Sequence, residues 1–260
     1  MAESSSKPRI RIREATQADA DTIAAIHFGA FEDSIMDQLM FPGGPSADAK
    51  QKFAARIFPR PVTDGEAPPK SQTFVYVAKL LPNDESAGTS GEVVAFAKWR
   101  LQAEPLPEEE WKKDQFECTT EVFGEGCDIT VINAFIGEMT RMSQRLAKGE
   151  AALYLGILAC TPSRQRLGAG SALMKWGVDL ADRLGLPAWV EASPIGYGLY
   201  RKFGYQDVDV LDLNITEKWG VTNTDGSNWG ANTAVELKGP APEGVFRTVI
   251  LRRPPKATTS

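Results

Sequence analysis

The spacing of apolar and polar residues predicts a chain in which strands and helices alternate. Residues 152–160 are almost continuously apolar, which is typical of a strand buried on both faces. From Gly168 onward the apolar residues recur at helical spacing, and Gly185 followed by Pro187 should end that helix. Its predicted buried stripe is Leu173, Trp176/Gly177, Leu180 and Leu184. The same patterns predict strands at 10–13, 74–80, 93–101, 188–193, 208–213 and 245–252, and helices at 20–31, 33–41, 47–58, 129–146 and 198–203.

The segments between these elements predict one domain with two large excursions. Residues 9–253 show no internal repeat and no clear boundary, so we expect a single domain between polar tails at 1–8 and 254–260. Residues 103–127 are acidic and polar, and residues 216–244 are rich in Gly, Asn and Thr. Both segments are predicted to be irregular excursions, and a turn cluster at 83–88 should form the tip of a hairpin.

Composition and charge narrow the classes of function. The chain of 260 residues is 42% hydrophobic and 24% charged, which is ordinary for a globular protein. Its net charge of -5 argues against nucleic-acid binding, which needs clustered Lys and Arg, and is compatible with a cationic small molecule as partner. The polar start, MAESSSKPR, and the lack of a long apolar run predict a cytoplasmic protein without membrane attachment.

The few histidines and cysteines limit metal and nucleophile chemistry. The single histidine, His27, excludes a multi-histidine zinc site, and no Cys-x-x-Cys occurs, so no metal is expected. A Ser-His-Asp triad would have only His27, and no G-x-S-x-G elbow accompanies it. A Cys118–Cys127 disulfide remains open, and Cys160, at the end of a buried strand, is interpreted as a packing residue.

The most informative segment connects the strand at 152–160 to the next helix. It reads Leu158-Ala159-Cys160-Thr161-Pro162-Ser163-Arg164-Gln165-Arg166-Leu167-Gly168-Ala169-Gly170-Ser171. Backbone N–H groups at a helix start point outward, and the helix dipole adds about half a positive charge there. Glycines allow a bulky anion to approach, and Arg164 and Arg166 add full charges. The segment therefore predicts a cradle for a diphosphate.

Three kinds of phosphate-binding loop compete for this segment. A Walker A loop is excluded because no G-x-x-x-x-G-K-S/T string occurs. A dinucleotide fingerprint fits Gly168-Ala169-Gly170 and the spacing of Glu191, but Leu173 stands where a third small residue is needed. The third kind fits at every position. Gln165-Arg166-Leu167-Gly168-Ala169-Gly170 matches the Gln/Arg-x-x-Gly-x-Gly/Ala loop of GCN5-related N-acetyltransferases.

A second block strengthens this resemblance. Gly198-Leu199-Tyr200-Arg201-Lys202-Phe203-Gly204-Tyr205 is similar to that superfamily's short helix, and Glu191-Ala192-Ser193-Pro194 resembles its fungal-type small-molecule members. The clear resemblance covers residues 152–206. It implies an α/β fold, with a central, mostly antiparallel mixed sheet and helices on both faces. It also implies acetyl-CoA as co-substrate.

The resemblance also assigns expected roles by position. Leu158, Ala159 and Cys160 would bind the pantetheine arm along the strand edge, and Tyr200 would lie near the thioester sulfur. The segment from Glu191 to Ser193 would face the reaction centre, with Ser193 among the residues that bind the cofactor. The pyrophosphate would be held by Gln165, Arg166, Leu167, Gly168, Ala169, Gly170 and Ser171.

The sequence identifies the residues that bind and activate the acceptor amine less clearly than those that bind the cofactor. Glu191, Glu138 and His27 are candidate bases, and a water chain is an equal alternative. Phe31, His27 and Asp37 are candidate acceptor-pocket residues by analogy. His27 on an apolar helix and Glu191 on a strand are also compatible with purely structural roles.

The expected activity is acetyl transfer from acetyl-CoA to a primary amine, catalysed by a monomer or homodimer. The nature of the amine stays open. A longer acyl-CoA donor, a CoA-binding sensor or inactive paralogue, and a dinucleotide-dependent oxidoreductase remain the alternatives.

Overall fold

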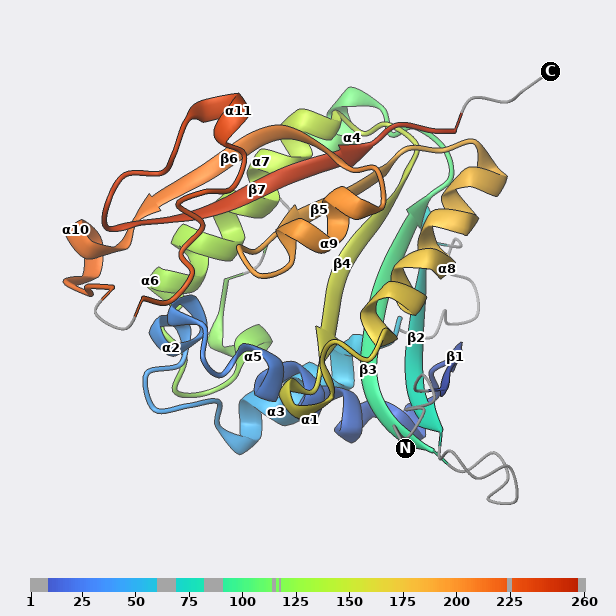
Figure 1. Ribbon diagram of the computed structural model, residues 1–260, viewed down its shortest axis with the longest axis horizontal. Coiled ribbons are helices and arrows are strands. Elements are labelled where there is room, and N and C mark those ends of the chain that lie inside the picture. The colour runs from blue at the N-terminus through green and yellow to red at the C-terminus, as the bar shows by residue number, and fades with distance from the viewer. Residues whose placement is uncertain are drawn as a thin grey trace, which may run out of the picture. The chain divides into compact units, whose positions relative to one another are not determined.

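The computed structural model describes residues 9–59, 69–81, 91–113, 116, 118–223 and 226–256. The strands of these residues form one seven-stranded sheet in the order β1-β2-β3-β4-β5-β7-β6 (Figure 1). β4 and β5 pair in parallel, whereas β1 with β2, β5 with β7 and β6 with β7 pair antiparallel, so the expected mixed sheet is confirmed. The strands are β1 (Arg9–Glu14), β2 (Ser71–Leu81), β3 (Glu92–Gln102), β4 (Ala152–Cys160), β5 (Ala188–Ala192), β6 (Gln206–Asn214) and β7 (Val245–Arg253).

The helices fall close to the predicted positions. The first begins after a capping box, in which the backbone N–H of Thr16 donates to Asp19, and Arg13 donates two hydrogen bonds to the same carboxylate. The α-helices are α1 (Ala20–Phe31), α2 (Ile35–Met40), α3 (Ala47–Ile57), α4 (Glu108–Trp111), α5 (Thr120–Phe123), α6 (Ile129–Ile132), α7 (Glu138–Ala147), α8 (Ala169–Leu184), α9 (Tyr197–Lys202), α10 (Ile215–Trp219) and α11 (Val235–Lys238).

The contacts divide the chain into two compact units. The first consists of the described residues up to Arg100, with Cys118–Ile132 and Gly156–Gly177. The second consists of the described residues of Leu101–Glu117, Asn133–Leu155 and Val178–Ser260. Strand β4 and helix α8 therefore each contribute residues to both units.

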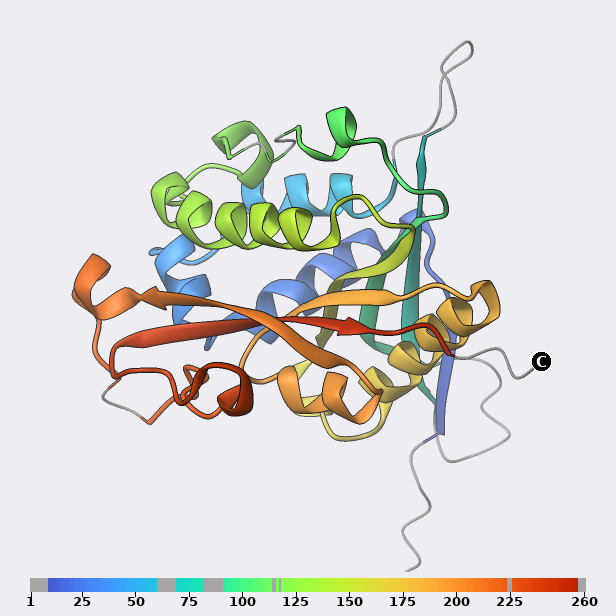
Figure 2. The same cartoon turned by 90° about the horizontal axis from the view of Figure 1, so that it is seen from above.

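In the first unit, the alternation along β3 directs side chains to two helical layers. Phe96 lies 6.4 Å from the ring of His27 on α1, and Trp99 lies 6.5 Å from the ring of Trp176 on α8. Because these positions are three residues apart on a strand, they face opposite sides of the sheet. Figure 2 shows α3 and α8 on opposite sides of β2 and β3. The expected helices on both faces are therefore present.

In the second unit, α7 covers one face of the strands, while α9 and α11 lie on the other side (Figure 2). The core under α7 is a cluster of Ala147, Ala152, Trp189 and Ile250. The indole Nε1 of Trp189 donates to Glu150 at 2.7 Å, and Arg252 donates two hydrogen bonds of 2.9 Å to the same carboxylate. The hydrogen bonds from Trp189 and Arg252 to Glu150 connect β5 and β7 to the turn before β4.

A buried arginine anchors the 216–244 excursion to the second unit. Arg247 on β7 is 1% exposed and donates to both carboxylate oxygens of Asp212, at 2.6 and 2.7 Å. Its Nη1 also donates to the carbonyls of Thr233 and Gly239 in the excursion. Hydrogen bonds from this one guanidinium thus hold the excursion against β7. The segment predicted to be irregular also contains most of α10 and all of α11.

We expect Arg247→Met to lower the free energy of unfolding by about 3 kcal/mol, because it leaves Asp212 and the carbonyls of Thr233 and Gly239 without their donor. Urea denaturation measures this loss. The control is Arg145→Met, because Arg145 and its partner Glu138 are exposed and such pairs contribute less than about 1 kcal/mol. Equal, small losses in both variants would contradict the anchoring role of Arg247.

Some details differ from the sequence-based expectation. The second half of β4 is only partly buried and Gly156 is exposed, so the prediction of burial on both faces is wrong there. Leu184 is 46% exposed, and the buried stripe of α8 includes Met174, Val178 and Ala181. The predicted helix at 129–146 is interrupted by a π-helical turn, Asn133–Gly137. Short helices α4 and α5 occur within the 103–127 excursion.

Three further expectations concern the hairpin tip and tails, the cysteines and membrane-spanning helices. The hairpin tip at 83–88 lies outside the described residues, as do the tail at 1–8 and the end of the tail at 254–260. Cys118, Cys127 and Cys160 are free thiols, so the possible Cys118–Cys127 disulfide is not formed. None of the helices among the described residues combines the length and apolar character needed to cross a membrane.

Candidate functional site

The second half of β4 has a backbone edge that β5 does not cover. Pairing between the two strands is confined to Leu153–Leu155 and Ala188–Val190. Beyond Leu155, the segment Gly156–Cys160 continues without a partner in that ladder, although every residue of it is described. Leu158, Ala159 and Cys160, the residues expected to bind the pantetheine arm, all lie in this segment.

The loop after β4 presents a row of free backbone donors. It passes through a short 3₁₀ turn, Pro162–Arg164, and then through two left-handed positions, Arg166 with φ 66° and Gly168 with φ 97°. Within the described part of the chain, no backbone or side-chain acceptor receives the N–H groups of residues 166–171. The first helical bond of α8 is donated by Ala172 to the carbonyl of Gly168 at 3.0 Å. Such a row of unpaired donors at a helix start is suited to bind an anion.

The space around this loop is open. A Cβ placed on Gly168 would find no atom within 4 Å, and Gln165, Arg166, Gly168 and Ser171 are exposed. Arg164 forms an exposed ion pair with Glu92 at 3.0 Å. Of the two predicted arginines, Arg166 therefore has no ion pair among the described residues.

Cys160 behaves as a packing residue. Burial raises the pKa of its thiol, and its Sγ donates hydrogen bonds to the carbonyls of Thr161 and Arg164. A thiol with a raised pKa is a poor nucleophile at neutral pH. The prediction of a structural role for Cys160 is consistent with this placement.

Helix α9, in the second unit, carries the other expected site residues. Ser193 accepts a hydrogen bond from the N–H of Gly196 through its Oγ and one from the N–H of Tyr197 through its carbonyl. These bonds form the turn that starts α9. Tyr200 then lies inside the unit, 7% exposed, with its ring 6.1 Å from that of Tyr205.

Tyr200 and Glu191 lie within electrostatic range of each other. Burial and then the negative charge of Glu191 raise the pKa of the Tyr200 hydroxyl well above its ordinary value. The hydroxyl therefore keeps its proton throughout the neutral range and can act as a donor. Glu191 itself is half-buried on β5, opposite Ile250 of β7.

His27 and Phe31, the predicted acceptor residues, belong to an aromatic cluster in the first unit. The imidazole of His27 stacks on Phe53 at 4.1 Å and meets the edges of Phe28 and Phe31 at 5.0 and 5.2 Å. Its Nδ1 is buried without a hydrogen-bond partner among the described residues. Burial and the charge of Arg56 lower the pKa of His27 to about 3. Such a weak base is unsuited to deprotonate an ammonium group.

We expect His27→Phe to stabilise the protein increasingly as the pH falls. The pKa of His27 is 6.5 in an ordinary setting and about 3 in the fold, so below pH 6.5 the unfolded state takes up a proton that the folded state refuses. This costs about 1.4 kcal/mol per pH unit between those two values. Denaturation of both proteins at several acidic pH values measures the difference. A difference that does not change with pH would contradict the burial of a neutral His27.

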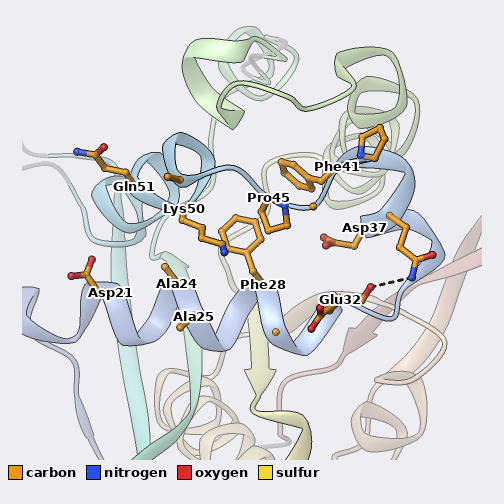
Figure 3. A pocket seen from close by; sticks show the side chains of 15 residues that line it. Asp21, Ala24, Ala25, Phe28, Glu32, Asp37, Phe41, Pro45, Lys50 and Gln51 are labelled. Carbon is orange, nitrogen blue, oxygen red and sulfur yellow. Dashed lines mark hydrogen bonds between the residues drawn. The ribbon is translucent and has the colours of Figure 1, made fainter.

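Asp37, which the sequence suggested only by analogy as an acceptor-pocket residue, lines a cavity of the first unit. The cavity measures about 810 Å³ and lies between α1, α2 and α3 (Figure 3). Asp37 on α2 is 7% exposed and points into it, and no donor among the described residues reaches its carboxylate. Burial and the neighbouring Glu32 raise the pKa of Asp37 to about 7. No sequence motif marks Asp37, and its burial, which would have singled it out, is visible only in the structure.

The other candidate base is engaged elsewhere. Glu138 on α7 is bound by Arg145 at 2.7 Å and lies 3.9 Å from Arg141, in an exposed ion-pair cluster. Neither His27 nor Phe31 lines the cavity, although their neighbours on α1 do.

Comparisons with known proteins give the fold a name. No family model and no curated protein matches the sequence. Among solved structures, the Corynebacterium glutamicum protein described as histone acetyltransferase HPA2 and related acetyltransferase aligns with a TM-score of 0.53 at 19% identity, covering 98% of this chain and 100% of that one. Polyamine N-acetyltransferase of Drosophila melanogaster aligns with a TM-score of 0.54 at 14% identity, covering 93% and 99%.

The chain has the fold of the GCN5-related N-acetyltransferases. A mosquito arylalkylamine N-acetyltransferase-like protein shares this fold with a TM-score of 0.50 at 15% identity, covering 94% of this chain and 99% of that one. The fold predicted from two short motifs, at 165–170 and 198–205, is thus confirmed over nearly the whole chain. At these sequence identities the comparison establishes the fold alone. The chemistry must be inferred from the residues of this chain.

Proposed function

We propose that this chain is an N-acetyltransferase that moves an acetyl group from acetyl-CoA to a primary amine of a small molecule, by direct attack in a ternary complex. The observation that carries the proposal is the open loop at 166–171, whose backbone N–H groups have no acceptor among the described residues. An anion-binding loop at this point in a GCN5-related fold supports a CoA thioester as the ligand. The three structural neighbours are named as acetyltransferases or acetyltransferase-like proteins, which agrees with this choice.

The residues of the loop and of β4 divide the work of holding acetyl-CoA. Gln165 to Ser171 would bind the pyrophosphate, mainly through backbone N–H groups, with Arg166 adding a positive charge. The uncovered edge of β4 at Leu158–Cys160 would hydrogen-bond the pantetheine arm, as an added strand would. Acetyl-CoA supplies the activated acetyl group.

The amine must lose a proton before it can attack. A free alkylammonium has a pKa of about 10.4, so its neutral form costs about 4–5 kcal/mol at neutral pH. A carboxylate near the reaction centre offsets part of this cost. Glu191 is the proposed base, because its charge acts on Tyr200, whereas His27 is too weakly basic.

The departing thiolate must gain a proton or a strong hydrogen bond. As the amine nitrogen bonds to the acetyl carbon, the carbon–sulfur bond breaks and the sulfur receives its proton from Tyr200 or from the solvent. The raised pKa of Tyr200 keeps its proton available and makes complete transfer costly, so we assign it the role of a hydrogen-bond donor that acts late in the step.

The proposal is tested by calorimetric titration with acetyl-CoA, followed by measurement of free thiol released in the presence of a panel of primary amines. Saturable binding together with amine-dependent release of thiol supports it. Binding without release with any amine would instead favour a CoA-binding sensor, and the absence of binding would remove both possibilities. Propionyl-CoA in the same assay decides whether a longer acyl donor is preferred.

A further inference from the structure

Lys98 carries a half-buried amine to which the proposed acetyl transfer gives no role. It lies on β3, two residues after Phe96, and therefore faces the same helical layer as Phe96. Its Nζ donates a hydrogen bond of 3.0 Å to the carbonyl of Arg56, near the end of α3. The first unit thus holds a reactive group, a lysine amine, between its sheet and a covering helix.

The surroundings of Lys98 disfavour its protonated form. Among the described residues, no carboxylate forms an ion pair with Lys98 or with Arg56. The guanidinium of Arg56 donates to the carbonyl of Val122 and lies over the ring of Phe123 at 4.8 Å. Burial and then the positive charge of Arg56 lower the pKa of Lys98 to about 8. In mildly alkaline solution Lys98 is therefore largely an uncharged amine, the form that attacks a thioester.

Lys98 lies next to the point where β4 loses its partner β5. The N–H of Thr161 donates to the carbonyl of Val94 at 2.9 Å, and a Cβ built on Gly156 would lie 3.6 Å from the carbonyl of Lys98. The neighbouring strands β3 and β4 therefore run antiparallel, with Lys98 beside Gly156. Gly156 is exposed and is the first residue of β4 beyond the pairing with β5. It has no side chain to stand between Lys98 and the uncovered edge of β4.

The order of the proposed cofactor contacts brings the thioester to the same level of β4. The pyrophosphate would lie at the loop 165–171, and the pantetheine arm would follow the edge of β4 from Cys160 back to Leu158. The thioester is at the far end of that arm, so it would come level with Gly156. Both the loop and this part of β4 belong to the first unit, as does Lys98.

The reach of a lysine side chain matches this arrangement. An arm bound to β4 as an added strand lies two strand spacings, or about 10 Å, from β3. An extended lysine side chain spans about 6 Å from Cα to Nζ, and a near-attack contact adds about 3 Å. To reach the thioester, Lys98 gives up its hydrogen bond to the carbonyl of Arg56.

Resting on the proposed acetyltransferase function, we propose that Lys98 is a self-acetylation site, which takes the acetyl group from acetyl-CoA bound to the same chain when no external amine is present. The lone pair of Nζ forms a bond to the acetyl carbon and the carbon–sulfur bond breaks. The proton that Nζ loses passes to the sulfur through the solvent. The products are a chain acetylated on Nζ of Lys98 and one equivalent of CoA thiol. The transfer occurs once per chain, because the amide nitrogen formed is no longer a nucleophile.

The test is incubation of the full chain with acetyl-CoA in the absence of any amine, followed by intact-mass measurement and peptide mapping. We expect one acetyl group per chain, on Lys98, with one equivalent of thiol released. The rate constant should not depend on protein concentration, because the transfer occurs within one chain. Lys98 should react at least about tenfold faster than Lys50, an exposed lysine of α3 that meets acetyl-CoA only from solution.

Two matched variants assign the modification to one side chain. Lys98→Arg keeps the positive charge and should abolish the acetylation, while the calorimetric affinity for acetyl-CoA stays within about threefold. Lys50→Arg makes the same exchange on an exposed helix position and should leave the acetylation of Lys98 unchanged.

The pH dependence of the reaction gives a second readout. The rate of self-acetylation should rise with pH and level off above about pH 8, where Lys98 has lost its proton. An ordinary lysine would show a rate that still rises near about pH 10. A rate of that second kind would show that Lys98 reacts as an ordinary surface lysine and would overturn the proposal.

The other outcomes separate this proposal from the acetyltransferase function. Binding of acetyl-CoA without acetylation of Lys98, or acetyl groups spread evenly over the exposed lysines, would overturn self-acetylation and leave the function standing. A rate constant that grows with protein concentration would also overturn it, because one chain would then modify another. Absence of acetyl-CoA binding would overturn the acetyltransferase function, and self-acetylation with it.

Discussion

Replacing Gly168 with glutamate should abolish detectable binding of acetyl-CoA to this protein. The residue adopts φ 97°, a conformation that side-chain-bearing residues rarely adopt, at the centre of the row of free N–H groups. The open space beside it is where the pyrophosphate would lie, so the new carboxylate would both occupy that space and repel the anion. A loss of at least about 100-fold in affinity, or about 3 kcal/mol, is expected from calorimetric titration.

Gly185→Glu is the matched control. Gly185, at the end of α8, also has a positive φ, 65°, and open space around its Cβ position. The substitution Gly185→Glu therefore causes a similar backbone strain and the same change in charge. It does so at the opposite end of α8 from the loop. Unchanged affinity in Gly185→Glu beside lost affinity in Gly168→Glu assigns the effect to the loop. Equal losses would show that instability, and not the loop, explains the result.

The fold was accessible from the sequence because its signals are local. The glycines at 168 and 185 mark the ends of α8, and the apolar run at 152–160 marks β4. Motif spacing then placed one helix and one strand between the two blocks, as the structure does. The burial of β4 was overestimated beyond Leu155, because the end of its pairing with β5 leaves no trace in the composition of the strand.

The residues of the candidate site could be predicted from the sequence only where a motif marks them. The loop at 165–171 and Tyr200 belong to such motifs, whereas the environments of His27 and Asp37 come from tertiary packing. His27 is surrounded by Phe28, Phe31 and Phe53, which lie on two helices, and this is why its pKa is lowered to about 3. Asp37 is buried although it lies on the short helix α2, where periodicity alone predicts an ordinary polar helix position.

Tyr200→Phe should lower kcat on the order of 10²- to 10³-fold, the range of one proton donor, with little change in the affinity for acetyl-CoA. The substitution keeps the buried ring and removes only the hydroxyl, so the fold should be retained. Because the pKa of this hydroxyl is raised, no alkaline limb from Tyr200 should appear in the wild-type pH profile below about pH 10, its ordinary pKa. Measuring kcat against pH for both proteins tests the two expectations together.

Tyr205→Phe is the control that separates donation from packing. Tyr205 is buried in the same unit with its ring 6.1 Å from that of Tyr200, and burial raises the pKa of its hydroxyl as well. Its hydroxyl has no partner among the described residues, so removing it should leave kcat within about threefold and should not lower stability. If both variants lose activity equally, the effect belongs to the shared packing of the two rings. If only Tyr200→Phe loses it, a single hydroxyl on α9 acts in the transfer step, since environment and size are matched between the two.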